Sequence, residues 1–127
     1  MIKVLTAIAC GAALAVATGC GESDQEQARE VVQQFVDARN DDDAAAECDL
    51  YSEDYLDELA VPDCPAFIEE QSSAVDGEER HEIVDVEVND GRATANVDVI
   101  REAEGGPVRI GLLLAEEDGD WRITGFQ

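Results

Sequence analysis

The sequence predicts an α+β fold in which three N-terminal helices pack on a four-stranded antiparallel sheet. Two observations predict this class. Up to about residue 74, apolar residues recur every three to four positions, which is the period of an α-helix. After Asp76-Gly77 the period changes to two, and glycine-containing turn signals separate four segments. Helices that precede a run of strands are typical of an α+β domain.

The first helix of the domain is predicted from about residue 24. Ser23 and Glu26 form a capping-box pattern, which marks the start of a helix. The opposite face of this segment is polar, so we expect an amphipathic helix of about four turns that lies on a core and ends near residues 39–40. Its apolar face consists of Ala28, Val31, Val32, Phe35 and Val36.

Shorter helical pieces are predicted before the sheet. The acidic run 41–43 lacks the alternating ligands and the glycine of a calcium loop, and it fits better as a helix N-cap. A helix should therefore occupy residues 44–50. Ser52 should cap a short helical piece that carries Tyr55, and Pro65 suits the first turn of a last helix, which should run over 66–74.

Four strands are predicted after residue 77. The first alternates Val84, Val86 and Val88 with polar residues, and the Asn-Asp-Gly turn at 89–91 leads into the second. The acidic tip at 116–120 fits a solvated hairpin better than a calcium site. Trp121, on the last strand, should be buried in the core. The inward stripes of the second and third strands are expected to be Ala93, Ala95, Val97 and Val99, and Val108, Ile110, Leu112 and Leu114.

The first 19 residues have the layout of a signal peptide, because Lys3 precedes an apolar run over 4–17 and small residues follow it. The run is shorter than the roughly 20 residues of a membrane span, so a permanent span is the weaker interpretation. Residues 17–20 (Ala-Thr-Gly-Cys) resemble the lipobox of bacterial lipoproteins. We therefore expect a signal peptide at 1–19, cleavage before Cys20, lipidation of Cys20, a tether at 20–24 and a domain at 25–127. The domain should be anchored on the outer face of the cell membrane.

The composition is strongly acidic, with a formal net charge of -23. Such a surface repels nucleic acid and anionic lipid headgroups. Solubility in the cell envelope explains the charge, because the acids are spread along the whole chain. Recruitment of cations or of a basic partner is the alternative interpretation.

Two cysteines remain once Cys20 is assigned to the lipid and the signal peptide is removed. Cys48 and Cys64 form an even pair in an oxidising compartment, and we expect them to be bridged. Two buried free thiols are the alternative. A zinc site is less favoured, since His81 is the only histidine.

The order of these elements, together with the terminal stretch Gly119-Asp120-Trp121-Arg122-Ile123, resembles the nuclear-transport-factor-2-like (NTF2-like) superfamily over about residues 24–127. The resemblance implies a cone, in which a curved sheet wraps around the helices. The Cys48 and Cys64 pair is similar to that of small secreted or lipid-anchored members from GC-rich bacteria. Members include ketosteroid isomerases, dehydratases and polyketide cyclases, so the fold alone does not assign a function.

The expected interior of the cone contains no acid or base, which favours binding over catalysis. Tyr51 and Tyr55 should lie at the edge of the core with hydroxyls in water, and His81 should be a solvated strand end. We expect a non-enzymatic module, with no cofactor or metal, that binds an envelope protein or a small apolar ligand; the alternative is an isomerase- or dehydratase-like enzyme. A homodimer through the sheet is also left open. The cavity lining is expected to include Val31, Val32, Phe35, Tyr51, Tyr55, Val97, Val99, Ile110 and Leu112.

Overall fold

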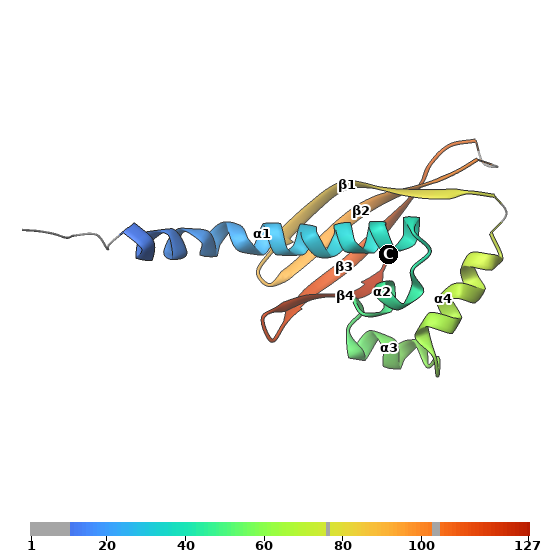
Figure 1. Cartoon of the computed structure of the whole chain (residues 1–127), viewed down its shortest axis with the longest axis horizontal. Helices are drawn as coiled ribbons and strands as arrows, with labels where there is room; N and C mark the ends of the chain where they lie inside the picture. Colours follow the sequence, from blue (N-terminus) through green and yellow to red (C-terminus); the bar gives the residue numbers. More distant parts are fainter. Residues whose placement is uncertain (1–10, 76, 103–104) are drawn as a thin grey trace, which may run out of the picture.

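A computed structural model describes residues 11–75, 77–102 and 105–127 (Figure 1). Residues 1–10 of the expected signal peptide lie outside the described residues. The predicted α+β class is confirmed, because helices pack on a four-stranded antiparallel sheet of order β1-β2-β3-β4. The elements in chain order are α1 (Gly11–Asn40), α2 (Ala44–Cys48), α3 (Glu53–Leu59), α4 (Cys64–Ser73), β1 (Glu79–Asn89), β2 (Arg92–Arg101), β3 (Val108–Glu117) and β4 (Asp120–Phe126).

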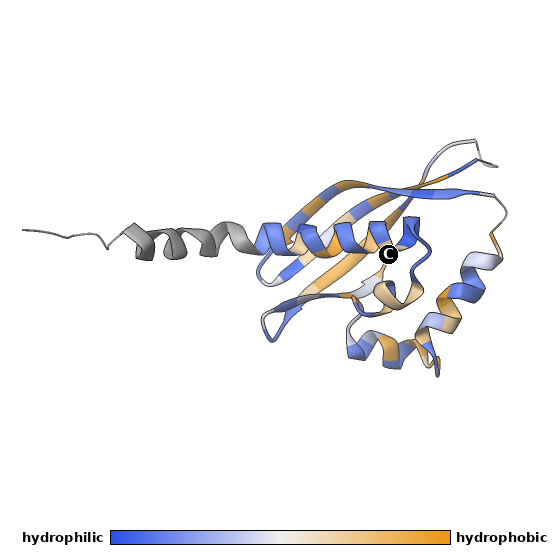
Figure 2. Cartoon of the chain, viewed as in Figure 1, coloured by the Kyte–Doolittle hydropathy of each residue, from blue (hydrophilic) through white to orange (hydrophobic). Residues whose placement is uncertain are grey.

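Helix α1 lies across one face of the sheet and buries its apolar stripe there, while its visible outer side is mostly hydrophilic (Figure 2). The predicted start at Ser23 is wrong, because the helix already runs from Gly11. The segment 11–22 contains four alanines, the residue that most favours helix, so the helix extends through Ser23. Among the helices that the structure describes, none is long and apolar enough to cross a membrane.

The end of α1 is fastened to strand β1 by a side chain. The Asn40 amide donates to the backbone carbonyl of His81 (3.2 Å), and its oxygen accepts from the backbone N–H of His81 (2.8 Å). These two bonds satisfy the backbone N–H and C=O of His81, which lie on the edge of β1 that has no neighbouring strand. They also fix where residues 79 and 81 lie relative to the last turn of α1.

The three short helices start at side-chain caps, and the caps of α2 and α3 are the predicted ones. Asp43 accepts from the backbone N–H of Ala46, and Ser52 accepts from that of Tyr55, each at 3.1 Å. Asp63 caps α4, which has a proline in its first turn. The helical piece after Ser52 is a helix in its own right, so the described part of the chain has four helices where three were expected.

A bulge in β1 changes which residues face the core. The pairing with β2 shifts by one residue between Ile83 and Asp85. Because side chains alternate along a strand, the shift moves Val84 to the outer face, where it is 39% exposed, while Val86 is buried. The alternation of Val84, Val86 and Val88 in the sequence therefore does not correspond to a single face of β1. Val108, at the start of β3, shares the face of Ile110 and Leu112 as expected, but it is 46% exposed because it lies at the end of the strand.

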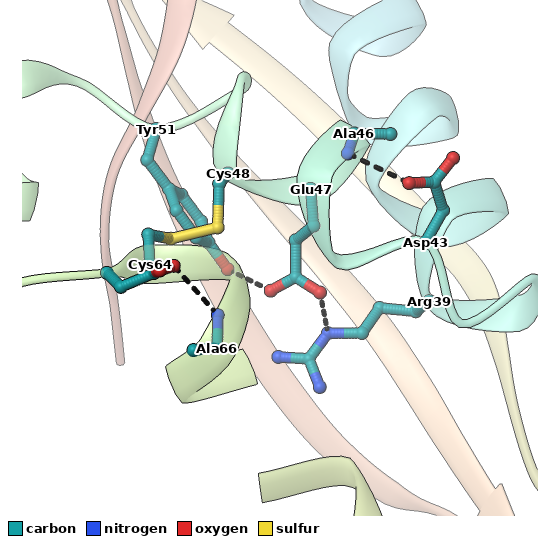
Figure 3. The surroundings of a disulfide bond; sticks show 9 residues. Arg39, Asp43, Ala46, Glu47, Cys48, Tyr51, Cys64 and Ala66 are labelled. Carbon is teal, nitrogen blue, oxygen red and sulfur yellow. Dashed lines mark hydrogen bonds and ion pairs between the residues drawn. A yellow bond between two sulfur atoms is a disulfide. The ribbon is translucent and has the colours of Figure 1, made fainter. Parts of the chain in front are cut away.

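The predicted disulfide between Cys48 and Cys64 is present and joins α2 to the start of α4 (Figure 3). It ties the start of α4 to α2, the helix against which α4 packs. The main core lies on the other side of α2, between α1 and the middle of the sheet. Trp121 is buried at its edge, as predicted, and its fully covered apolar members are Ala28, Val32, Phe35, Val97, Leu112 and Ile123.

Candidate functional site

A cavity of about 380 Å³, which we call the cone cavity, opens where α3 and α4 face the ends of the strands. Its walls combine apolar side chains with a smaller group of polar ones. The apolar lining consists of Leu59, Phe67, Ile68, Val99, Ile110 and Phe126, and the polar lining of Arg39, Tyr51, Tyr55, Gln71, Glu79, His81, Arg101 and Gln127. Ligand sites usually have this composition, with apolar walls and a few convergent polar groups.

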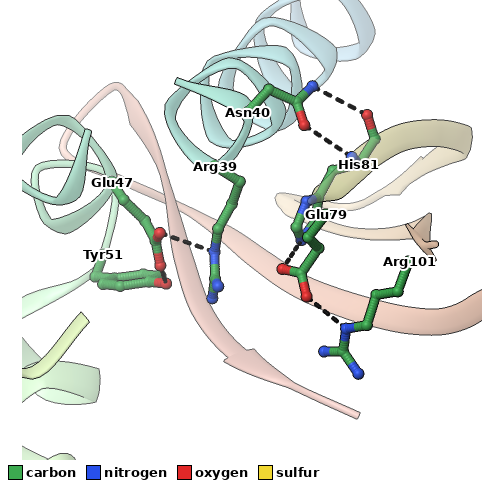
Figure 4. A network of polar contacts seen from close by, with 7 residues as sticks. All are labelled: Arg39, Asn40, Glu47, Tyr51, Glu79, His81 and Arg101. Atoms are coloured by element: carbon green, nitrogen blue, oxygen red, sulfur yellow. Dashed lines mark hydrogen bonds and ion pairs between the residues drawn. The ribbon is translucent and has the colours of Figure 1, made fainter. Parts of the chain in front are cut away.

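The first polar group is built around Glu47, which is 1% exposed. Arg39 Nε lies 2.8 Å from Glu47 Oε1, and the Tyr51 hydroxyl donates a hydrogen bond to Glu47 Oε2 (Figures 3 and 4). Burial raises the pKa of Glu47, and the nearby Arg39 charge opposes that rise. Burial and the neighbouring Glu47 also raise the pKa of Tyr51, so its hydroxyl stays protonated at neutral pH.

These contacts set the direction of the Arg39 guanidinium. Its carbon lies 5.4 Å from the centre of the Phe35 ring, and Glu47 holds Nε. Figure 4 shows the two terminal nitrogens pointing away from Glu47, in the space between Tyr51 and the pair Glu79 and His81. Among the described residues, neither terminal nitrogen has a hydrogen-bond partner. Two donors of one rigid group are therefore left for a ligand.

The second polar group lies at the start of β1. Arg101 Nε is 2.5 Å from Glu79 Oε2, and His81 Nε2 is 3.6 Å from Glu79 Oε1. Burial lowers the pKa of His81, as does the charge of Arg39, while Glu79 opposes the shift. His81 is therefore neutral at pH 7. Its Nδ1 is buried and has no hydrogen-bond partner within the described parts of the chain.

Three aromatic rings form one wall of the cavity. The ring of Tyr51 packs edge-on against those of Tyr55 (5.2 Å) and Phe126 (6.1 Å), and Tyr55 and Phe126 are 5.9 Å apart. Edge-to-face packing of this kind fixes ring orientation. Burial raises the pKa of Tyr55, which keeps a neutral hydroxyl at the cavity.

The structure divides the residues expected to line a cavity into two groups. Tyr51, Tyr55, Val99 and Ile110 lie at the cone cavity. Val31 is partly buried beside a separate hollow near the β3–β4 turn. The others are completely covered by neighbouring side chains and belong to the packed core: Val32, Phe35, Val97 and Leu112.

The expectation that no acid or base faces the interior is wrong. His81 is buried, not solvated, and the Tyr51 hydroxyl contacts Glu47, not water. The signals were present in the sequence. Position 39 continues the helical stripe of residues 28, 32 and 35, and positions 79 and 81 share the face of Ile83 before the bulge.

A metal site and a second hollow are the other candidates for a functional site. Within the described residues, no cluster of three metal-ligating side chains has the proximity of a metal site. A larger hollow, of about 570 Å³, lies beside the cone cavity, and charged or polar residues make up most of its lining. It lacks the apolar walls that a ligand site needs, so the cone cavity is the better candidate.

Solved structures share this architecture at low sequence identity. An NTF2-like protein of unknown function from Shewanella baltica has a TM-score of 0.60 at 13% identity, over 82% of this chain and 90% of that chain. A candidate polyketide cyclase from Sinorhizobium meliloti has a TM-score of 0.54 at 17% identity, over 77% of this chain and 94% of that chain. A candidate ketosteroid isomerase from Kribbella flavida has a TM-score of 0.54 at 19% identity, over 80% and 77% of the two chains.

No protein-family model matches the chain, and no curated protein matches its sequence. Likeness at these identities concerns the fold alone. The helices packed on a four-stranded antiparallel sheet, together with these neighbours, give the chain an NTF2-like fold.

Proposed function

We propose that this chain is a lipid-anchored, extracytoplasmic binding module that takes a small, largely apolar ligand into the cone cavity. The observation that carries the proposal is the cavity of about 380 Å³, whose apolar walls come from α3, α4 and the sheet and whose lining includes the charged residues Arg39, Glu79 and Arg101. This volume lies at the lower end of the range of ligand pockets, about 300–1,000 Å³, so the ligand is compact.

Binding is favoured over catalysis because the acidic groups near the cavity are engaged with one another. Glu47 contacts both Arg39 and Tyr51, and Glu79 contacts Arg101. A carboxylate held in an ion pair is a poor general base, since the pair must break before a proton can be taken up. These ion pairs fix the orientation of the charged side chains, and the pair with Glu47 leaves the terminal nitrogens of Arg39 as hydrogen-bond donors for a ligand.

One observation supports the alternative, an isomerase- or dehydratase-like enzyme. His81 is neutral, lines the cavity and keeps Nδ1 unpartnered among the described residues, as a general base would. Tyr55 or Arg39 would then stabilise developing negative charge on a substrate oxygen. The neighbours named as a cyclase and an isomerase are compatible with this second function.

The anchor is supported by the lipobox-like residues 17–20 and the apolar run before them. Lipid attached to Cys20 would hold the domain at the outer face of the cell membrane. Replacing Cys20 by serine should abolish labelling by radioactive palmitate. Unchanged labelling and membrane retention of that variant would remove this part of the proposal.

Ligand binding can be tested by native mass spectrometry on residues 24–127, which contain every buried core and cavity residue that the structure describes. We expect one small molecule per chain, either co-purified or bound on incubation with 1-octanol. Ile110→Phe fills the cavity and should abolish the adduct, whereas Val84→Phe, at an exposed position on the outer face of the sheet, should retain it. Equal adducts in both variants, or none in the wild type, would contradict the proposal.

A protein partner at the envelope, or a second copy of the chain, would instead use the outer face of the sheet. That face carries charged pairs such as Arg109 with Asp98, 2.9 Å apart. Size-exclusion chromatography with light scattering on residues 24–127 tests the homodimer directly.

A further inference from the structure

We propose that the polar end of the cone cavity is a carboxylate receptor, so that the ligand is a compact monocarboxylic acid whose head binds the Arg39 guanidinium. This inference rests on the proposed function, because it requires the cone cavity to be a ligand site. It adds the chemical class of the ligand and the residue that selects it.

Arg39 is held as a receptor for a planar anion. Arg39 Nε lies 2.8 Å from Glu47 Oε1 in an ion pair, although its N–H makes no hydrogen bond among the described residues, and the Tyr51 hydroxyl donates to the other oxygen of Glu47. The guanidinium also lies over the Phe35 ring. A carboxylate can accept two parallel hydrogen bonds from the two terminal nitrogens, which is the geometry that arginine offers and lysine does not.

The other charges at the cavity favour an anion over a cation. The one acidic side chain among its lining residues, Glu79, is already in an ion pair with Arg101. An ammonium group would therefore meet two guanidinium groups and no unpaired acid there. A neutral ligand without an acceptor would bury the Arg39 donors unsatisfied, which costs roughly 1–3 kcal/mol per group.

The remaining walls suit an apolar body attached to that head. Phe67 and Ile68 project from α4, and Val99 and Ile110 from the sheet, all lining the same cavity as Arg39. The Tyr55 hydroxyl, for which no hydrogen-bond partner is found in the described part of the chain, adds a further donor. A carboxylate at Arg39 thus places its hydrocarbon part against side chains that offer dispersion and burial.

The experiment compares three probes with the same eight-carbon chain: sodium octanoate, 1-octanol and octylamine. Isothermal titration calorimetry on residues 24–127 at pH 7 should give an affinity for octanoate at least tenfold higher than for octanol, and octylamine should bind weakest. Equal affinity for octanoate and octanol would overturn the carboxylate receptor and leave the binding module standing. Failure of all three probes, with no co-purified ligand in the native mass spectrum, would overturn both.

Arg39→Lys keeps a positive charge beside Glu47 but removes the two-pronged donor. We expect a loss of tenfold or more in octanoate affinity and an unchanged octanol affinity. Arg109→Lys, a matched change on the outer face of the sheet, should alter neither. An Arg39→Lys variant that keeps the octanoate preference would show that Arg39 is not the receptor.

A second variant covers the case in which Arg39→Lys does not fold. Arg39→Gln combined with Glu47→Gln removes both buried charges together, so that neither is left uncompensated. Its thermal unfolding reports folding independently of ligand. We expect it to bind octanol and to lose the preference for octanoate, and a retained preference would overturn the proposal.

Discussion

The two ends of this cone are held together by different forces. Between α1 and the middle of the sheet lies the packed region, in which Val32, Val97 and Leu112 are completely covered. Around the cone cavity lies the cavity region, where the buried side chains include Glu47 and His81, and where a disulfide fastens the covering helices. The packed region is stabilised by apolar burial, at about 25 cal/mol per Å². The cavity region relies on ion pairs, hydrogen bonds and a covalent link.

This difference separates stability from recognition. A filled core cannot admit a ligand, whereas a cavity with paired charges can, provided that other contacts keep its walls in place. The order of expected effects follows from this division. Substitutions in the packed region and loss of the disulfide should cost most stability, and substitutions of the polar side chains in the cavity region should act mainly on affinity or on the response to pH.

The largest effect is expected for Leu112→Ala in the packed region. Leu112 is 0% exposed, so the substitution leaves a void and should lower the free energy of unfolding by about 2–5 kcal/mol. Urea unfolding followed by circular dichroism measures the loss. Val108→Ala, on the same strand at an exposed position, is the control and should cost far less. Equal losses would mean that the two positions do not differ in packing.

Loss of the disulfide should be nearly as costly. Cys48 and Cys64 are 16 residues apart, and closing such a loop contributes about 3 kcal/mol in the chain-entropy model. The double variant Cys48→Ser, Cys64→Ser should therefore unfold at a lower urea concentration than the wild type. Because α4 lines the cone cavity, octanoate affinity should fall as well, while dithiothreitol should change neither property of the double variant. Unchanged stability on reduction of the wild type would contradict this role.

The buried acid should give the cavity region a characteristic pH dependence. The pKa of Glu47 in the folded state lies above its ordinary value of 4.5, so the folded state binds this proton more tightly than the unfolded state. The contribution of Glu47 to stability is therefore largest below pH 4.5 and falls as the pH rises through the folded-state pKa.

Glu47→Gln removes this titration. The difference in free energy of unfolding, variant minus wild type, should increase as the pH rises from 4.5 through the folded-state pKa of Glu47, and it should be constant above that pKa. The difference is used because His81 also titrates. Its pKa is lowered in the folded state, so its contribution to the free energy of unfolding increases with pH below pH 6.5, opposite to that of Glu47. A difference that does not vary with pH would show that Glu47 titrates alike in the folded and unfolded states.

The smallest effect tests the bulge in β1. Val84→Thr on the outer face should change stability by less than about 0.5 kcal/mol. Val86→Thr, two residues along, places a hydroxyl in the packed region and should cost about 1–3 kcal/mol. Thermal unfolding of the two variants side by side measures the contrast, and similar losses would place both valines on one face.

The packed region could be predicted from the sequence better than the cavity region. Regular periodicity determined the face of α1 and the stripes of β2, because apolar residues at fixed spacing report burial directly. The bulge at Ile83 and Asp85 could not be seen in that pattern, since Val84 continues the alternation. The burial of Glu47 could not be seen either, because its five-residue helix is too short to give a periodic signal. Arg39 continues the buried stripe of α1, but its ion pair with Glu47 depends on a tertiary contact that this spacing does not report.

The division into a filled region and a ligand-binding region is tested most directly by an NMR titration of residues 24–127 with sodium octanoate. We expect amide shifts to move for Tyr55, Phe67 and Ile110, which line the cone cavity. The amides of Ala28 and Val86, and the indole N–H of Trp121, belong to the packed region and should not move. Shifts of comparable size in both regions, or shifts confined to the packed region, would contradict the account.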